Sequence, residues 1–102
     1  MKYLFFLILV MSNSIYAQTY STNMSEVTIK NFSCDSFTGF AEFNVVNKSS
    51  KQITIITIDI YDSSGDPINR ANSFGFVSPN SGYRATAMLG NCNYSRLNFS
   101  VN

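Results

Sequence analysis

Apolar and polar residues alternate at every second position along most of the chain after residue 26. Runs of this kind cover 27–30, 39–46, 55–61, 83–89 and 96–101. A period of two with one apolar face is typical of half-buried strands. Clusters of Asn, Ser, Gly, Asp and Pro separate the runs and indicate turns. The pattern therefore predicts an all-β chain, folded as a small antiparallel β-sandwich of about six strands.

The stretch Pro67–Val77 allows two interpretations, either two short strands with a turn near Asn72 or one bent strand. Cys34 follows the first strand and Cys92 lies between the last two, so the two loops share an end of the sandwich only if an even number of strands separates them. One strand over this stretch gives four strands between the cysteines. Two strands give five and leave the sulfurs about 17–20 Å apart, whereas a disulfide needs Cα atoms about 4.4–6.8 Å apart. We predict a single bent strand, bulged near Ala71–Ser73.

The choice of a single strand over Pro67–Val77 requires a bond between Cys34 and Cys92, which are the two cysteines of the chain. In an oxidising compartment, two cysteines in a small domain usually pair. Closing a loop of roughly 60 residues is worth roughly 4 kcal/mol, a large share of the stability of so short a chain. The spacing does not fit a CxxC redox centre. Two thiolates without a histidine do not complete a tetrahedral metal site. The sequence therefore predicts one disulfide that closes the fold.

The first seventeen residues have the pattern of a secretory signal peptide, with Lys2 as the positive start, an apolar run over 3–11 and a polar exit. The apolar run is shorter than the about 20 residues that span a bilayer, so we expect no stable membrane anchor. We predict cleavage between Ala17 and Gln18, and a single domain over 18–102. The protein is then exported, either periplasmic or extracellular.

The net charge of the chain limits the classes of partner that we expect. The formal net charge of the chain is +1, and without Lys2 six basic residues balance six acidic ones. Nucleic acids and anionic membranes bind clustered Lys and Arg, so neither is expected as a partner. A surface rich in Asn, Ser and Thr favours recognition of a protein by shape rather than by long-range charge.

The segment Gln52–Ile58 combines high β propensity with low charge and no proline. Such a segment is an aggregation hazard when it lies at a sheet edge. We therefore predict an interior strand whose face of Ile56, Ile58 and Ile60 is covered. The alternative is a strand that recruits a partner by edge pairing.

Several segments resemble the FxLYD-type bacterial domain, namely Gly39–Ser49, Ile58–Asp62, Gly65 and Val77–Pro79. The family's pattern is a G-x-V-x-N-x-S strand and turn, an F-x-L-Y-D strand end, a glycine turn and a proline-containing turn into a later strand. Here Tyr and Asp of the strand end match, while isoleucines replace Phe and Leu. The resemblance covers most of 37–89. It implies an immunoglobulin-like, extracytoplasmic β-sandwich with no catalytic residue to carry over, and its pattern does not include the cysteine pair.

No catalytic or metal-binding constellation stands out in the sequence, and we expect no cofactor. The segment Asp62–Asp66 holds two carboxylates beside a glycine but lacks the Asp/Asn repeat and terminal Glu of a calcium loop. We interpret it as a turn in which Asp62 bonds the backbone of Ser64. Asp59 is interpreted as a solvated strand residue. Asn47 is interpreted as a turn former that tolerates unusual backbone angles.

The candidate binding residues are Phe40, Phe74 and Phe76. Phe40 lies opposite Phe43 on its strand and should face outward unless that face is covered. If Phe74 and Phe76 share a face, some aromatic surface is left over, and an exposed aromatic patch would be a contact site for a protein or a glycan. The simpler interpretation is that the sandwich holds these rings inside.

Together these features favour a non-enzymatic, exported protein-binding module, such as an inhibitor, an adhesin or an envelope-assembly accessory. The alternative is a structural subunit of a surface assembly, joined by edge-strand pairing with Gln18–Ser25 as a loose donor arm. An enzyme is not expected, because glycosidase-like chemistry needs two converging carboxylates and the six acidic residues fall mostly on turns or alternating faces. The sequence does not set the oligomeric state.

Overall fold

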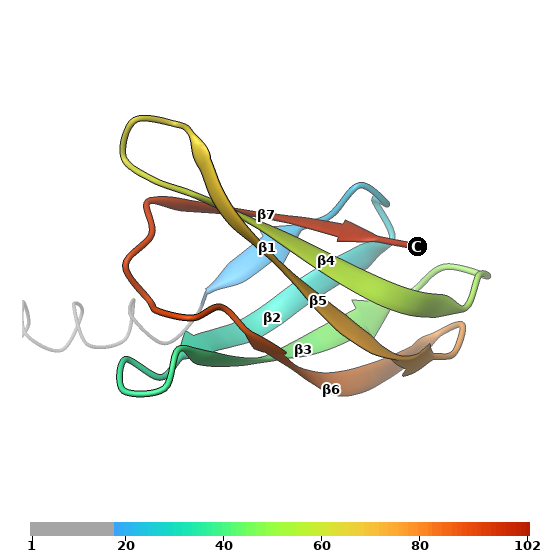
Figure 1. Ribbon diagram of the computed structural model, residues 1–102. Helices are drawn as coiled ribbons and strands as arrows, with labels where there is room; N and C mark the ends of the chain where they lie inside the picture. Colours follow the sequence, from blue (N-terminus) through green and yellow to red (C-terminus); the bar gives the residue numbers. More distant parts are fainter. Residues whose placement is uncertain (1–17) are drawn as a thin grey trace, which may run out of the picture.

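The computed structural model describes residues 18–102, which form seven β-strands in two antiparallel sheets packed face to face (Figure 1). The predicted all-β sandwich is confirmed. The strands are β1 (Thr19–Ser21), β2 (Val27–Cys34), β3 (Phe40–Asn47), β4 (Ile53–Tyr61), β5 (Pro67–Val77), β6 (Ser81–Met88) and β7 (Arg96–Val101).

One sheet has the order β1-β2-β3-β6 and the other the order β5-β4-β7. Constant-type immunoglobulin domains share this division into four and three strands, although the order within the sheets differs. Sequential antiparallel connections join β1 to β2, β2 to β3 and β4 to β5 within a sheet, whereas the chain changes sheet after β3, β5 and β6. Each sheet therefore ends in two edge strands, and β5 runs beside β6 along one side of the sandwich.

The seventh strand comes from the segment expected to be a loose arm, so that expectation is wrong. Residues Thr19–Ser21 form β1 and pair antiparallel with β2. The anchor is Tyr20, whose ring lies 5.6 Å from that of Phe32 and 4.9 Å from that of Phe99. Burial of one aromatic ring against a cluster contributes enough to order a short polar segment.

The alternating apolar residues fill the space between the sheets. Phe43 and Phe99 are the largest fully buried side chains, and their rings meet edge to face at 5.6 Å. The strand β4 lies between β5 and β7 in its sheet. Its side chains Ile56, Ile58 and Ile60 are buried in the core. The prediction of an interior strand with this face covered is confirmed.

The stretch Pro67–Val77 forms the single strand predicted, but its bulges lie elsewhere. The ladder with β4 is regular from Asn69 to Phe74 and shifts register at Ile68 and at Gly75–Phe76. The prediction of a bulge near Ala71–Ser73 is therefore wrong. At the second bulge Gly75 packs closely against β6, since a Cβ there would lie 3.2 Å from the ring of Tyr83.

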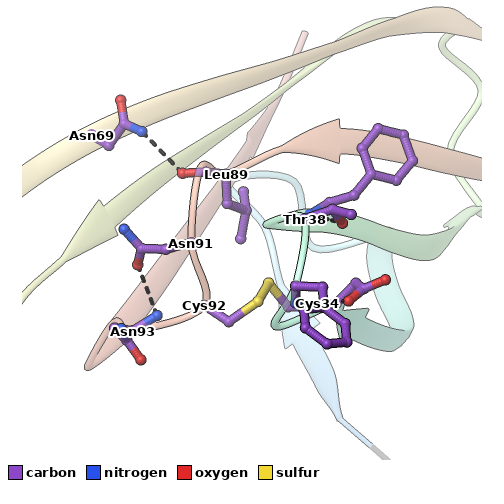
Figure 2. The surroundings of a disulfide bond; sticks show 10 residues. Cys34, Thr38, Asn69, Leu89, Asn91, Cys92 and Asn93 are labelled. Carbon is purple, nitrogen blue, oxygen red and sulfur yellow. Dashed lines mark hydrogen bonds between the residues drawn. A yellow bond between two sulfur atoms is a disulfide. The ribbon is translucent and has the colours of Figure 1, made fainter.

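The disulfide closes one end of the sandwich, as the strand count required (Figure 2). Cys34 ends β2 and Cys92 lies in the connection from β6 to β7, with Cα atoms 5.9 Å apart. The Asn69 side-chain amide also donates a hydrogen bond to the Leu89 carbonyl at 3.1 Å, which ties β5 to the same connection. The confirmed bond and the single strand β5 support each other.

The predicted signal peptide and Ala17 lie outside the described residues, which begin with Gln18. Among residues 18–102, no helix is long and apolar enough to cross a membrane.

Candidate functional site

Large apolar side chains reach the surface at two places. One group lies near the end of β5, and the other lies where β3 begins, beside the disulfide. The exposed large hydrophobic residues are Phe37, Phe40, Ile68, Phe74, Phe76, Tyr83 and Met88. The structure thus brings Phe74 and Phe76 together but leaves Phe40 at the opposite end of the sandwich.

The first group forms a surface that we name the β4–β5 aromatic surface, made of Ile55, Phe74 and Phe76. Phe74 is the cross-strand partner of Ile55, and the bulge at Gly75–Phe76 exposes the second ring as well. Both phenylalanine residues are 71% exposed. With Thr54 they line an open groove of about 450 Å³. These side chains form an exposed apolar surface across the edge strand β5 and its neighbour β4.

The interpretation that the sandwich holds these rings inside is wrong, and the reason is the register of β5. Ala71 and Ser73 are the buried residues in the regular part of the strand, so the alternation places Phe74 on the outer face. The register shift at Gly75–Phe76 leaves Phe76 exposed as well, and Val77 is the next buried residue. The rings of β5 therefore point away from the core.

Phe40 is 39% exposed and lies opposite Met88 on β6. These two side chains line a second groove of about 540 Å³ that includes Cys34, Asp35 and Glu42. Its carboxylates are both engaged. Asp35 accepts a hydrogen bond from a backbone N–H of its own turn at 2.9 Å, and Glu42 forms an ion pair of 3.3 Å across to β6. The groove has the chemistry of a contact surface.

The other carboxylates singled out in the sequence also have local roles. Asp62 Oδ1 accepts hydrogen bonds from the backbone N–H groups of Ser64 at 2.9 Å and Asp66 at 3.0 Å, so the predicted turn is confirmed. Asp59 is not a freely solvated residue. Its carboxylate lies 2.6 Å from Arg70 Nε and is 18% exposed. The hydrogen bond to Asp59 raises the pKa of Arg70 further above its ordinary value.

Asn47 is fully buried, and it forms the turn after β3 as predicted, but its backbone is not among the positive-φ positions, so the expected unusual backbone angles are wrong. Its amide nitrogen faces the carbonyl oxygens of Lys51 at 2.7 Å and of Val77 and Ser78 at 3.2 Å. Its Oδ1 accepts hydrogen bonds from the N–H and the hydroxyl of Ser49 at 2.9 and 2.6 Å. One side chain thus joins the turn after β3 to the end of β5.

The titratable groups with the clearest shift are two tyrosines beside the aromatic core. Burial raises the pKa of Tyr94 to about 12, and burial also raises the pKa of Tyr20. Both phenols are therefore neutral at physiological pH. No group of three or more potential metal ligands gathers within residues 18–102.

Ile55, Tyr83 and Met88 are surface residues that sequence reasoning missed. Ile55 stands on the polar face of an alternating strand, and that break in the pattern is the signal that could have identified it. Met88 gave the same signal, because it stands on the polar face of its strand with Arg84 and Thr86. Tyr83 gave none, because it stands on the apolar face with Ala85 and Ala87. Comparisons with known protein families, with curated proteins and with solved structures found no match to the chain.

Proposed function

We propose that the protein is an exported, non-enzymatic protein-binding module that contacts its partner through the β4–β5 aromatic surface. One observation carries the proposal. Phe74 and Phe76 lie side by side on an edge strand, next to Ile55, and each is 71% exposed. A few residues supply most of the binding energy of a protein interface, and aromatic residues are frequent among them. Exposed apolar patches on a folded domain mark such sites.

Export is supported by the disulfide between Cys34 and Cys92, since such bonds persist in oxidising compartments. The signal-peptide pattern of the first seventeen residues points the same way. A periplasmic or an extracellular location fits both observations.

The non-enzymatic assignment is supported by what the acidic side chains do. Asp59 and Glu42 are held in ion pairs, and Asp62 bonds the backbone of its own turn. The resemblance to FxLYD-type domains, which implies no catalytic residue, belongs to the same proposal. An inhibitor, an adhesin and an envelope-assembly accessory all fit a module of this kind.

Site-specific photocrosslinking in the cell that produces the protein tests this function. A benzophenone side chain replaces Phe74 or Phe76 in separate variants, and Phe37, which is 98% exposed near the disulfide, is the matched control. We expect adducts larger than a dimer of this chain from positions 74 and 76, which an added Phe74→Ser change weakens at position 76. The absence of such adducts, or equal adducts from position 37, would contradict the proposal.

The alternative function, a structural subunit joined by edge-strand pairing, would need a strand other than the predicted donor arm. A donor arm from Gln18–Ser25 is not available in this fold, because Thr19–Ser21 already pairs with β2 of its own sheet.

A further inference from the structure

Among residues 18–102, four strands lie at sheet edges, and β5 is the longest of them. It has eleven residues, against three in β1, eight in β6 and six in β7. The segment from Asn69 to Phe74 pairs regularly with β4 on one side only. The other side of an edge strand presents unpaired N–H and C=O groups that can accept a further strand.

Edge strands are usually guarded by charge, proline or a bulge. In β5 the proline is the first residue, and the bulges at Ile68 and Gly75–Phe76 flank the regular segment without interrupting it. Arg70 is the one charged residue of the strand, and its guanidinium Nε lies 2.6 Å from Asp59 of the neighbouring strand, on the side away from the free edge. The centre of β5 therefore lacks an effective guard.

We propose that β5 pairs with β5 of a second copy of this chain, antiparallel and about a two-fold axis at Asn72. The two three-stranded sheets then become one sheet of six strands. A two-fold contact of this kind uses the same surface on both copies and closes on itself, so it gives a dimer and not a fibre.

The register about Asn72 is self-complementary. It places Arg70 of one copy opposite Phe74 of the other, twice by symmetry. Arg70 is 67% exposed along its side chain and Phe74 is 71% exposed. A guanidinium over an aromatic face is attractive. The same sheet already contains such a pair, since Arg96 lies 4.0 Å above the ring of its cross-strand partner Tyr61.

Charge also favours a second copy as the occupant. Residues 18–102 hold six basic and six acidic side chains, so two copies approach without net repulsion. The pairing joins five residues of each strand, a length of about 17 Å. A contact through one short pair of strands buries less surface than the roughly 1,200 Å² that is the lower limit for stable complexes. The dimer is therefore reversible and forms at high protein concentration.

This inference goes beyond the proposed function. It uses the backbone edge of β5, whereas the outer side of the β4–β5 aromatic surface stays open to another protein. In the dimer the two aromatic surfaces lie on the same face of one continuous sheet, which would offer a partner two equivalent contact sites.

Disulfide trapping tests the register directly. The full chain is expressed with export to an oxidising periplasm, and Asn72→Cys is compared with Asn98→Cys. Both residues are exposed, and Asn98 lies on β7, the opposite edge of the same sheet. Antiparallel partners have Cα atoms about 4.5–5.5 Å apart, within the reach of a disulfide. We expect N72C to form a covalent dimer under mild oxidation at least tenfold faster than N98C. Equal rates would overturn the proposal.

Sedimentation equilibrium gives an independent measurement. The wild-type protein should shift from monomer towards dimer as its concentration rises, and Asn72→Lys, which places two ammonium groups at the axis, should remain a monomer. Asn98→Lys should behave as the wild type. A wild-type protein that stays monomeric up to about 1 mM, or an N72K variant that dimerises equally, would overturn the proposal. Heterologous adducts at position 74 would still support the proposed function, so the two can fail separately.

Discussion

Asn47 offers the sharpest test of the physical account of the fold. Its amide makes five hydrogen-bond contacts inside the protein, with the backbone of Lys51, Val77 and Ser78 and with the N–H and hydroxyl of Ser49. All these groups lie at the end of the sandwich opposite the disulfide. Replacing Asn47 by alanine removes every one of these contacts and leaves polar backbone groups buried.

The magnitude follows from the number of bonds the amide can make. Two N–H groups and one oxygen satisfy about four hydrogen bonds, each worth about 0.5–1.5 kcal/mol net. Ser49 keeps one substitute partner, because its hydroxyl lies 3.2 Å from the Lys51 carbonyl. We therefore expect Asn47→Ala to lower the free energy of unfolding by about 3 kcal/mol. A domain of 85 residues has roughly 4–13 kcal/mol in total.

Thermal and urea unfolding measure this loss. The chain has no tryptophan, so far-ultraviolet circular dichroism is the suitable signal. A loss of about 3 kcal/mol corresponds to a fall of about 12–24 °C in Tm. The matched control is Asn44→Ala on the same strand, whose Oδ1 accepts one surface hydrogen bond from Arg84, and this change should cost less than about 1 kcal/mol. Equal losses from the two variants would mean that the buried hydrogen bonds of Asn47 do not stabilise the fold.

Three further experiments, with four variants, test other parts of the fold. Gly39→Ala combines a left-handed backbone, which costs about 1–2 kcal/mol, with a collision between the new methyl group and the facing loop. Gly65→Ala has a positive φ but open space, so in urea denaturation it should lose about 1 kcal/mol and Gly39→Ala clearly more. Replacing Cys34 and Cys92 by alanine should remove roughly 4 kcal/mol, and an unchanged Tm would contradict this. Burial raises the pKa of Tyr94 from 10.0 to about 12, so the folded state keeps the phenol proton after the unfolded state has lost it, and stability should fall as pH rises from about 10 to about 12. Tyr94→Phe should flatten that part of the stability curve.

The sandwich and its disulfide could be predicted because both depend on patterns within the sequence. A period of two assigns each strand residue to one of two faces, and the strand count between the cysteines tests whether β5 is one strand or two. The short strand β1 could not be predicted in this way. Its anchor is one tyrosine whose partners, Phe32 and Phe99, lie far away along the chain.

The candidate site was predicted only in part. Phe74 and Phe76 were candidates, but whether they face inward depends on the register of β5 against β4 and on the bulge at Gly75–Phe76. The burial of Asn47 was missed for a similar reason, since two of its partners are carbonyl groups about thirty residues away. Local patterns predict alternation along a strand, whereas its register and the partners of a buried side chain depend on distant segments.

Because Phe74 and Phe76 lie outside the core, the proposed binding role of the β4–β5 aromatic surface can be tested without damage to the fold. Phe74 and Phe76 lie outside the packed interior, so the double change to serine removes apolar area that is already largely in contact with water. We expect the free energy of unfolding to stay within about 0.5 kcal/mol per substitution of the wild-type value, while photocrosslinks placed at Ile55 on the same surface are lost. A large drop in stability would mean that the rings support the fold, and the exposed aromatic surface would then need no partner to explain it.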